Sequence, residues 1–469
     1  MNLSPVGAAL PRDFRSFDQP NPSRRKAAPT NWATTFRLIA LCSVAVVLLS
    51  PAYAAETPPA TSFSFDFGSG PAAPGKTRIT AGADYRAETG FGFDRGTASA
   101  VTAGNGFVTS EQPFFFSVKV PEGNYRVTVT LGNPSTDSVA TIKAESRRLM
   151  LEQLPIKAGE SATRTFTVNV RDSHLPPPPL NAPGGNAVRL NDREAGVLHW
   201  DDKITFEFNG SHPSVRALEL TRVDDAITVF LAGDSTVTDQ PNEPGASWGQ
   251  MLPRFFKADV AIANHAESGE TMKSFITGLR LDKILSEVKP GDWLFIQFGH
   301  NDSKASRPQT YAEASTIYPA YLKVFIAEAK RRGVTPVLFS PVQRRGFDAN
   351  GKIRNSHGDY PAAVRRVAEE TGVTFIDLAA QSATFYEALG PEKSPLAFSN
   401  GGRDATHHDN YGAYEIAKCV VESLRTAKLD LAKHLIENLP PFDPAHPDAP
   451  ETFALPASPG RSTQAPRGN

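Results

Sequence analysis

Cysteine is nearly absent from this chain of 469 residues, which contains only Cys42 and Cys419. Cys42 lies in a segment that we expect to be removed, so the mature chain would keep one thiol and form no intrachain disulfide. Cys419 stands in a helical pattern and is predicted to be a buried structural thiol. No CxxC pair or His/Cys spacing suits structural zinc. The fold must therefore depend on a hydrophobic core, for which 40% hydrophobic residues are sufficient.

An excess of charge of one sign is also missing, because 49 Lys and Arg residues balance 50 Asp and Glu residues. This balance argues against a nucleic-acid partner, which would require a strongly basic surface. The charges are unevenly distributed, since the first 54 residues carry six basic and two acidic side chains. The remainder of the chain is therefore mildly acidic, with a net charge of about −5.

No apolar run is long enough to favour a permanent membrane span. Residues Leu38–Leu49 form an apolar stretch of roughly 12 residues, whereas a spanning helix needs about 20. A basic stretch that begins at Arg24 precedes it, and Ala52-Tyr53-Ala54 follows as a small-x-small cleavage pattern. We predict a cleaved export signal over residues 1–54, a linker over 55–61, and a secreted or periplasmic protein without stable membrane insertion; a membrane anchor is the alternative.

The region 62–224 has the pattern of short strands. In Tyr125–Leu131 every second residue is apolar, and Phe166–Val170 and Ile204–Phe208 repeat this alternation. A period of two indicates strands with one face in water, and the turn residues between them are typical of an all-β domain. We therefore predict an N-terminal antiparallel β-sandwich.

The region 225–438 has a different pattern, in which apolar runs of strand length alternate with helical stretches. Strands are predicted at Ile227–Ala232, Val260–Ala263, Trp293–Phe298, Val337–Ser340 and Val373–Leu378, and helices at Ala312–Arg332, Pro361–Glu370 and about Tyr411–His434. Continuous apolar strands with helices between them indicate a parallel sheet covered on both faces. The proline-rich residues 439–469 are predicted to be a disordered tail.

Polar residues follow the first three predicted strands, at the sheet edge where such folds bind ligands. The first strand runs into Gly233-Asp234-Ser235, where a strand-to-helix turn would expose the serine hydroxyl. The turn after the second strand contains Gly269, and Asn301 follows the third. Two backbone N–H groups and an amide would suit the oxyanion of a tetrahedral intermediate. Each motif alone is also typical of an ordinary turn or helix cap.

A fourth motif, Asp404-Ala-Thr-His407, precedes the last predicted helix. A spacing of three residues on a turn allows the carboxylate to orient one imidazole nitrogen while the other serves as a general base. Alternatively, Asp404 caps the helix beside a surface histidine. A metal site at His407-His408-Asp409 is disfavoured because neighbouring side chains diverge and no second ligand pair accompanies them.

In this order the four motifs resemble those of the SGNH or GDSL hydrolases, and within them the rhamnogalacturonan acetylesterase-like carbohydrate esterases. The resemblance rests on Gly-Asp-Ser-Thr-Val-Thr-Asp at 233–239, Gln-Phe-Gly-His-Asn-Asp at 297–302 and Asp-Ala-Thr-His at 404–407, and covers about residues 227–435. It implies an α/β/α domain with a flavodoxin-like parallel sheet, and no cofactor or metal. It also implies Ser235 as nucleophile, His407 as base, Asp404 as its orienter, and an oxyanion hole of the Ser235 and Gly269 amides and the Asn301 side chain. His408 departs from the pattern, since many relatives have an aromatic residue there, and this departure would alter the cleft wall.

The expected function is therefore removal of acetyl groups from a pectic polysaccharide of the rhamnogalacturonan type, through an acetyl-enzyme on Ser235. The alternatives are the same chemistry on acetylxylan, a lipid or a thioester, and an inactive carbohydrate-binding protein. The N-terminal region more loosely resembles galactose-binding-like sandwiches. Its aromatic residues Tyr85, Phe91, Phe93 and Trp200 are candidates for stacking on sugar rings. The alternative is that this domain only supports the esterase domain.

Overall fold

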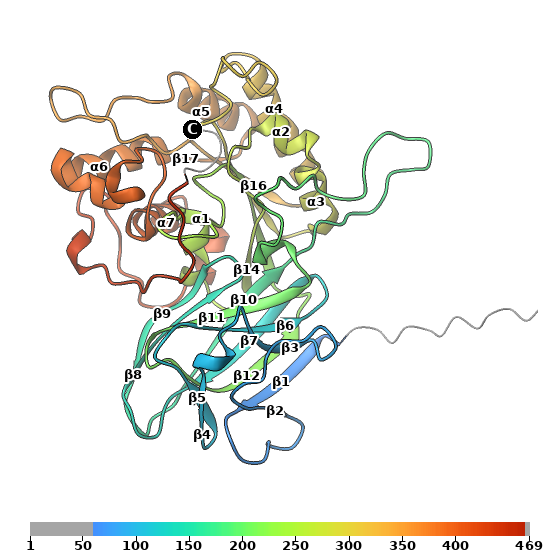
Figure 1. Cartoon of the computed structure of the whole chain (residues 1–469). Coiled ribbons are helices and arrows are strands. Elements are labelled where there is room, and N and C mark those ends of the chain that lie inside the picture. The colour runs from blue at the N-terminus through green and yellow to red at the C-terminus, as the bar shows by residue number, and fades with distance from the viewer. Residues whose placement is uncertain (1–59, 465–469) are drawn as a thin grey trace, which may run out of the picture. The chain divides into compact units, whose positions relative to one another are not determined.

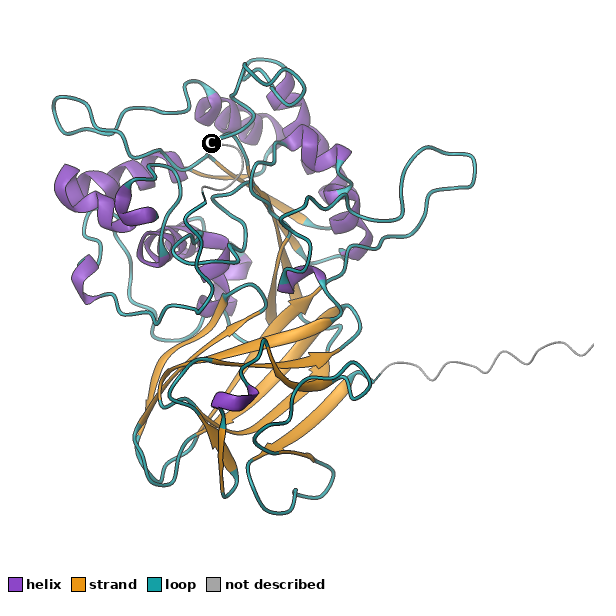
Figure 2. Cartoon of the chain, viewed as in Figure 1, coloured by secondary structure: helices purple, strands orange, loops and turns teal. Residues whose placement is uncertain are grey.

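Two kinds of sheet follow one another along the chain in the computed structural model, which describes residues 60–464 (Figures 1 and 2). The strands of the first part end at Arg222, and a parallel sheet with helices begins at Ile227. This two-part architecture confirms the predicted fold class. The predicted signal over 1–54 and most of the predicted linker over 55–61 lie outside the described residues.

The first part is a β-sandwich. One sheet has the order β10 (Ala162–Val170), β7 (Gly123–Leu131), β12 (Ser214–Arg222), β1 (Ser62–Phe67) and β2 (Thr77–Ile79), with β5 (Phe107–Thr109) on β12 and β4 (Thr102–Gly104) on β5. The other has the order β3 (Phe91–Asp94), β6 (Phe114–Lys119), β11 (Lys203–Ser211), β8 (Ser138–Ala144) and β9 (Arg148–Ile156). All neighbouring strands are antiparallel except β1 and β2. In β7 the apolar positions are buried and the polar ones are not, as the alternation predicted.

Strand β11 departs from that expectation, because Ile204–Asn209 are buried on both faces. The second face is covered by the C-terminal segment: the Asn209 amide donates to the Ala457 carbonyl (2.9 Å), and the Ser458 hydroxyl donates to the Glu207 carboxylate (2.7 Å). The prediction of a face in water was wrong for this strand because its cover comes from residues about 250 positions later.

Residues 439–464 follow a defined path, so the prediction of a disordered tail was wrong for them. The Tyr411 hydroxyl donates to the Asp448 carbonyl (2.6 Å), the Ser458 amide donates to the Glu243 carboxylate (3.0 Å), and the Glu243 amide donates to the Gly460 carbonyl (2.8 Å). Apart from a short 3₁₀-helix at Pro450–Thr452, the prolines disfavour helix here, but an extended chain is stable when the folded domains satisfy its polar groups. Residues 465–469 lie outside the described part of the chain.

The second part contains a five-stranded sheet in which all neighbours are parallel. Its order is β14 (Val260–Asn264), β13 (Ile227–Gly233), β15 (Trp293–Gln297), β16 (Thr335–Phe339) and β17 (Thr374–Ile376). The helices are α1 (Trp248–Met251), α2 (Met272–Thr277), α3 (Arg280–Glu287), α4 (Ile317–Arg331), α5 (Tyr360–Thr371), α6 (Leu378–Lys393) and α7 (Asn410–Thr426). The strand order reverses at β13, so the carboxyl end of β13 is the switch point where doubly wound sheets bind ligands.

The last helix is shorter than the predicted Tyr411–His434. Helix α7 ends at Thr426, Lys428 has a positive φ of 52°, and a separate 3₁₀-helix covers Asp430–His434. A left-handed residue cannot continue a right-handed helix, which explains the break. Among the described residues 60–464, no helix combines the length and the apolar character needed to cross a membrane.

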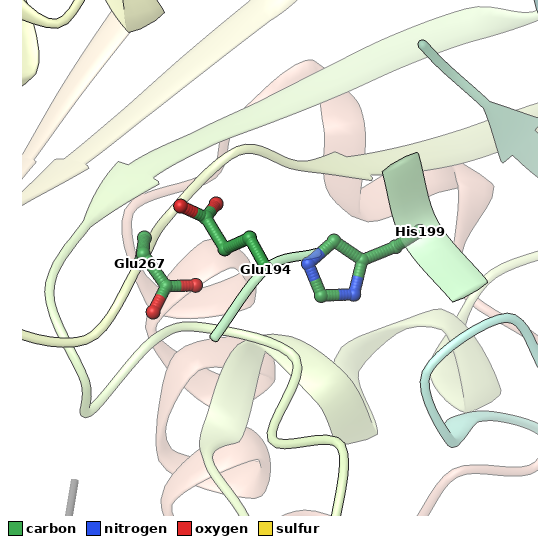
Figure 3. Close-up of side chains that lie close together, drawn as sticks. All are labelled: Glu194, His199 and Glu267. Carbon is green, nitrogen blue, oxygen red and sulfur yellow. The ribbon is translucent and has the colours of Figure 1, made fainter. Parts of the chain in front are cut away.

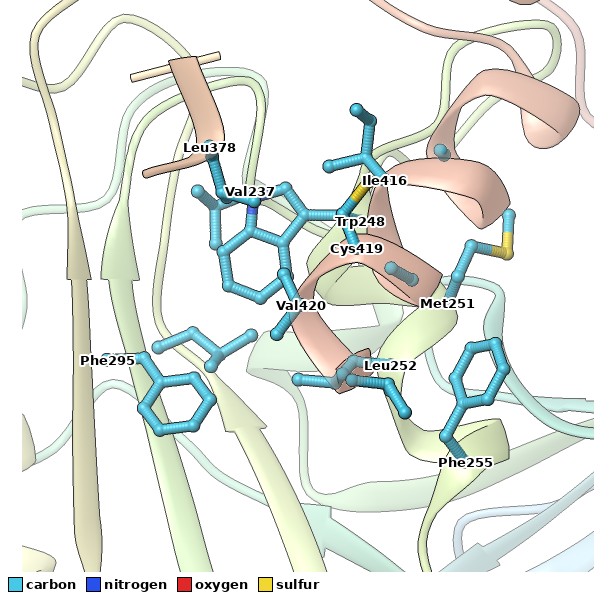
Figure 4. Close-up of a cluster of buried hydrophobic side chains, with 14 of the residues drawn as sticks. Val237, Trp248, Met251, Leu252, Phe255, Phe295, Leu378, Ile416, Cys419 and Val420 are labelled. Atoms are coloured by element: carbon cyan, nitrogen blue, oxygen red, sulfur yellow. The ribbon is translucent and has the colours of Figure 1, made fainter. Parts of the chain in front are cut away.

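Separate hydrophobic cores cover the two faces of the parallel sheet. Val229 and Leu231 of β13 point to a core that includes Trp248 and α7, whereas Phe230 and Ala232 point to the core formed with α2–α5. Figure 4 shows the first core around the Trp248 indole, whose Nε1 donates to the Gln297 side chain (2.9 Å). Cys419 is 1% exposed in this core, and burial raises the pKa of its thiol, as expected of a structural cysteine.

Candidate active site

Ser235 lies two residues beyond the carboxyl end of β13. A Cβ at Gly233 would come within 2.6 Å of the Val237 side chain, so the close turn requires a glycine there. The amides of Val237 and Thr238 donate to the Asp234 carbonyl (3.0 and 3.1 Å). This is a single hydrogen-bonded turn, since no helix begins between the end of β13 and α1 at Trp248. The predicted strand-to-helix turn was therefore wrong in its second half.

The structure brings Ser235, His407 and Asp404 together across 172 sequence positions. The Ser235 Oγ lies 2.8 Å from His407 Nε2, and His407 Nδ1 lies 2.8 Å from Asp404 Oδ2. Asp404 Oδ1 accepts from the amides of Thr406 (2.8 Å) and His407 (3.0 Å). Burial opposes ionisation of Asp404, but the hydrogen bonds from His407 and the Coulomb attraction to it outweigh burial and lower the Asp404 pKa to about 2. A carboxylate that is ionised at neutral pH thus holds the imidazole toward the serine.

The segment that carries His407 is fixed on both sides of the imidazole. The Ser399 amide donates to the His407 carbonyl (2.9 Å), and the Arg345 amide donates to the Ala405 carbonyl (2.8 Å). His408 was expected to alter a cleft wall, but its ring is 1% exposed, packs on Phe398 and has its Nε2 within 2.7 Å of the Tyr386 hydroxyl. Burial lowers the pKa of His408 to about 3, so it is a neutral core residue.

Gly269 and Asn301, the other predicted oxyanion residues, lie beside one another. Gly269 has a φ of +89° in a turn closed by the Glu270 amide and the Glu267 carbonyl (3.2 Å), a conformation that favours glycine. The Asn301 side chain donates one N–H to the Glu270 carbonyl (3.0 Å), and its oxygen accepts from Lys304 Nζ (3.2 Å). The amide is thereby oriented, with a second N–H to donate. Their role as oxyanion donors, with the Ser235 amide, stays a prediction.

Buried amide side chains that the sequence analysis did not single out support the serine turn. Asn264, the last residue of β14, donates to the Val237 carbonyl and to Asp239 Oδ1 (both 2.7 Å). Gln297, the last residue of β15, donates to the Thr236 hydroxyl (2.6 Å). Gln297 opens the motif at 297–302, whereas the sequence signal for Asn264 is that a polar residue ends an apolar strand.

The β-sandwich also holds the segment that follows Ser235. In the hairpin formed by β8 and β9, Arg148 is the first residue of β9; its Nε donates to Asp239 Oδ2 (2.6 Å), and both side chains are at most 2% exposed. The adjacent Arg147 donates to the Gly245 carbonyl (2.8 Å) and pairs with Glu243 (2.6 Å). Strand periodicity alone could not reveal that this hairpin turn reaches the esterase domain.

A second group of titratable side chains, Glu194, His199 and Glu267, lies near the serine turn, and their ligand atoms are all within 4.8 Å of one another (Figure 3). The Glu194 carboxylate accepts from the Trp200 indole (3.0 Å) and from Arg280 (2.5 Å). These contacts neutralise the acidic group, so its donor set does not suit a cation. Burial and the neighbouring Glu194 raise the pKa of Glu267.

A cavity of about 280 Å³ adjoins the serine turn and is lined mainly by polar side chains. The sandwich contributes Arg193 and His199, the loop after Ser235 contributes Gln240 and Asn242, and the C-terminal segment contributes Ser462. Gln240 also donates to the Ser235 carbonyl (2.9 Å), so the cavity wall and the serine turn are directly connected.

Two of the aromatic side chains considered for sugar stacking are not accessible. Phe93 is 1% exposed in the sandwich core, and Trp200 is 9% exposed with Arg171 over its ring at 4.4 Å. The hypothesis of stacking was therefore wrong for these two, because both rings contribute to packing. Tyr85 and Phe91 are half-buried.

The carboxyl edge of a doubly wound sheet thus carries a hydroxyl, an imidazole and a carboxylate in one hydrogen-bonded line, the arrangement of α/β enzymes that transfer acyl groups through a serine. Residues 231–413 match the GDSL-like lipase/acylhydrolase family. The chain belongs to this family, as predicted, and is a carboxylic-ester hydrolase. Residues 63–177 match the family described as beta-agarase/YXIM esterase-like, galactose-binding domain-like, which confirms the predicted type of the sandwich.

Several relatives come from Bacillus subtilis. The chain is 40% identical to rhamnogalacturonan acetylesterase RhgT over 223 residues, which cover 45% of this chain and 94% of that protein. It is 28% identical to the uncharacterized esterase YxiM over 379 residues, which cover 77% of this chain and 90% of the relative. A crystal structure of the YxiM protein is 24% identical, covers 79% of this chain and 99% of its own, and has a TM-score of 0.43.

Proposed function

We propose that this protein is a serine esterase that removes acetyl groups from an acetylated pectic polysaccharide of the rhamnogalacturonan type. The observation that carries the chemistry is the hydrogen-bonded line from Ser235 through His407 to Asp404. The substrate class is supported by the relatives RhgT and YesY of Bacillus subtilis, a rhamnogalacturonan acetylesterase and a probable one, which are 40% and 38% identical to this chain. The polar lining of the adjoining cavity counts against a lipid substrate.

In the proposed mechanism the Ser235 hydroxyl attacks the carbonyl carbon of a sugar acetate while His407 Nε2 accepts its proton. The tetrahedral oxyanion receives hydrogen bonds from the amides of Ser235 and Gly269 and from the second N–H of Asn301. His407 then donates its proton to the departing sugar oxygen, which leaves an acetyl-enzyme. A water molecule, deprotonated by His407, attacks the acetyl carbonyl and releases acetate and the free serine.

The test is acetate release from acetylated rhamnogalacturonan by the wild-type chain and by Ser235→Ala. We expect the variant to lose at least about 10³-fold in kcat, because no other group at this position can form the acyl intermediate. Ser286→Ala is the matched control, since the Ser286 hydroxyl donates only to the Lys283 carbonyl on α3. Full activity of a folded Ser235→Ala chain would disprove the assignment.

We further propose that the protein acts outside the cytoplasm, because the basic stretch, short apolar run and small-x-small pattern of residues 24–54 suit a cleaved export signal, and polysaccharide substrates are extracellular. Determination of the first residue of the mature protein after expression tests this proposal. A start at or near residue 55 is expected, and an intact leader on the active protein would contradict it.

A further inference from the structure

Two basic side chains, Lys304 and Arg344, lie on the β15–β16 side of the triad. Lys304 follows β15, and its Nζ donates to the Asn301 side chain (3.2 Å). Arg344 follows β16, and its guanidinium donates to the Thr406 hydroxyl and to the His300 carbonyl (3.5 Å). Thr406 immediately precedes His407 in the chain. Lys304 therefore contacts a predicted oxyanion residue, Arg344 contacts the residue before His407, and both basic side chains are only half-buried.

Neither of these side chains has a carboxylate partner within 4.0 Å among residues 60–464. Two fully buried lysines do have such partners: Lys143 pairs with Glu207 (3.5 Å) and Lys283 with Glu122 (2.6 Å). The basic pair near the triad lacks the carboxylate that neutralises these two lysines.

The acidic groups that act most strongly on Lys304 and Arg344 already have other hydrogen-bond partners. Asp234 is fully buried; its Oδ1 accepts from Thr236, and its Oδ2 lies 3.3 Å from His300 Nδ1. Asp404 is bonded to His407. Burial, followed by the positive charges of Arg344 and Arg307, lowers the pKa of Lys304 to about 8. The positive charge beside Asn301 is therefore incompletely neutralised, and a bound anion would stabilise it.

We infer that Lys304 and Arg344 form a carboxylate-binding subsite that holds a uronate of the substrate chain while a nearby acetyl ester of the same chain is hydrolysed. The inference deepens the proposed function and rests on it. A guanidinium and an ammonium group make strong charge-assisted hydrogen bonds to a carboxylate, and a partly buried position strengthens them. A uronate held there would place its acetylated neighbour at Ser235, whereas a neutral xylan chain would gain nothing from these charges.

The test compares acetylated rhamnogalacturonan oligosaccharides whose carboxylates are free with the same oligosaccharides after full methyl esterification, with acetate release as the readout. We expect wild-type kcat/KM to be at least about tenfold higher on the free acid, and to fall with added NaCl on that substrate alone. In Lys304→Gln and Arg344→Gln this preference should shrink to near unity. Lys323→Gln on α4, where Lys323 pairs with Glu370 (2.7 Å), is the matched control and should keep the preference.

The ratio between the two substrates separates binding of the carboxylate from structural damage, because a distorted site would lose activity on both. Equal wild-type rates on the two oligosaccharides, or a preference unchanged in both Gln variants, would overturn the subsite and leave the proposed esterase intact. Hydrolysis of 4-nitrophenyl acetate without acetate release from any pectic substrate would overturn the proposed function, and the subsite with it.

Discussion

The buried ion pair between Arg148 of the sandwich and Asp239 of the esterase domain provides a quantitative test of how the two domains cooperate. Arg148 Nε lies 2.6 Å from Asp239 Oδ2, and the side chains are 2% and 1% exposed. In Arg148→Met the Asp239 carboxylate would keep only the Asn264 amide as a partner. Breaking a buried pair by removing one charge typically costs about 3–5 kcal/mol, because the remaining charge stays uncompensated.

We therefore expect Arg148→Met to lower the free energy of unfolding by about 3–5 kcal/mol, measured by urea unfolding with circular dichroism. Since Asn264 links Asp239 to the Val237 carbonyl in the serine turn, kcat on 4-nitrophenyl acetate should also fall, by about tenfold to a hundredfold. The double variant Arg148→Met/Asp239→Asn should cost less than the sum of the two single changes, because it leaves no buried charge.

The matched control is Arg126→Met, which removes an exposed pair with Asp225 (3.4 Å; 36% and 77% exposed) and should cost at most about 1 kcal/mol. The reasoning is refuted if Arg148→Met is as mild as this control, or if the costs of the single changes simply add in the double variant.

Three further predictions concern the reacting centre and the C-terminal segment. Asp404→Asn should lower kcat by about 10⁴-fold with little change in KM, because an amide cannot stabilise the imidazolium. Steady-state kinetics on an acetate ester measures this, and an unchanged kcat would show that Asp404 is dispensable. The folded-state pKa of Asp404 is about 2 against an ordinary 3.8, so ionised Asp404 stabilises the fold above pH 4 by about 2 kcal/mol, and this contribution is lost as the pH falls from about 4 to 2. Urea unfolding across that pH range should therefore show a weaker pH dependence in Asp404→Asn than in the wild type. Identical pH dependence in the two proteins would contradict this link between protonation and stability. Deletion of residues 456–469 should lower the unfolding free energy by about 2–4 kcal/mol, since the buried Lys143 and Glu207 lose their contacts to Ser458; an unchanged urea midpoint would exclude this role for the segment.

Much of the fold was predictable because it depends on local periodicity. The alternation in Tyr125–Leu131 identifies a strand with one buried face, and the apolar runs after Ile227 identify a buried parallel sheet. The predictions were wrong where contacts from residues distant in the sequence determined the conformation of a segment. The prolines of 439–464 suggested disorder, but the segment is bound by Glu207 and Glu243, neither of which any local pattern connects with it.

The sequence by itself determined the fold class, the family and the placement of Ser235, Gly269, Asn301 and Asp404-x-x-His407 at the carboxyl edge of one sheet, because each follows directly from strand periodicity and a short motif. Only the tertiary structure decided that the Arg147–Arg148 turn of the sandwich fixes the loop after the serine, and that Lys304 and Arg344 lack acidic partners beside the triad. The physical reason is that charge balance and burial depend on all neighbours in space, and many of these come from segments that are distant in the sequence.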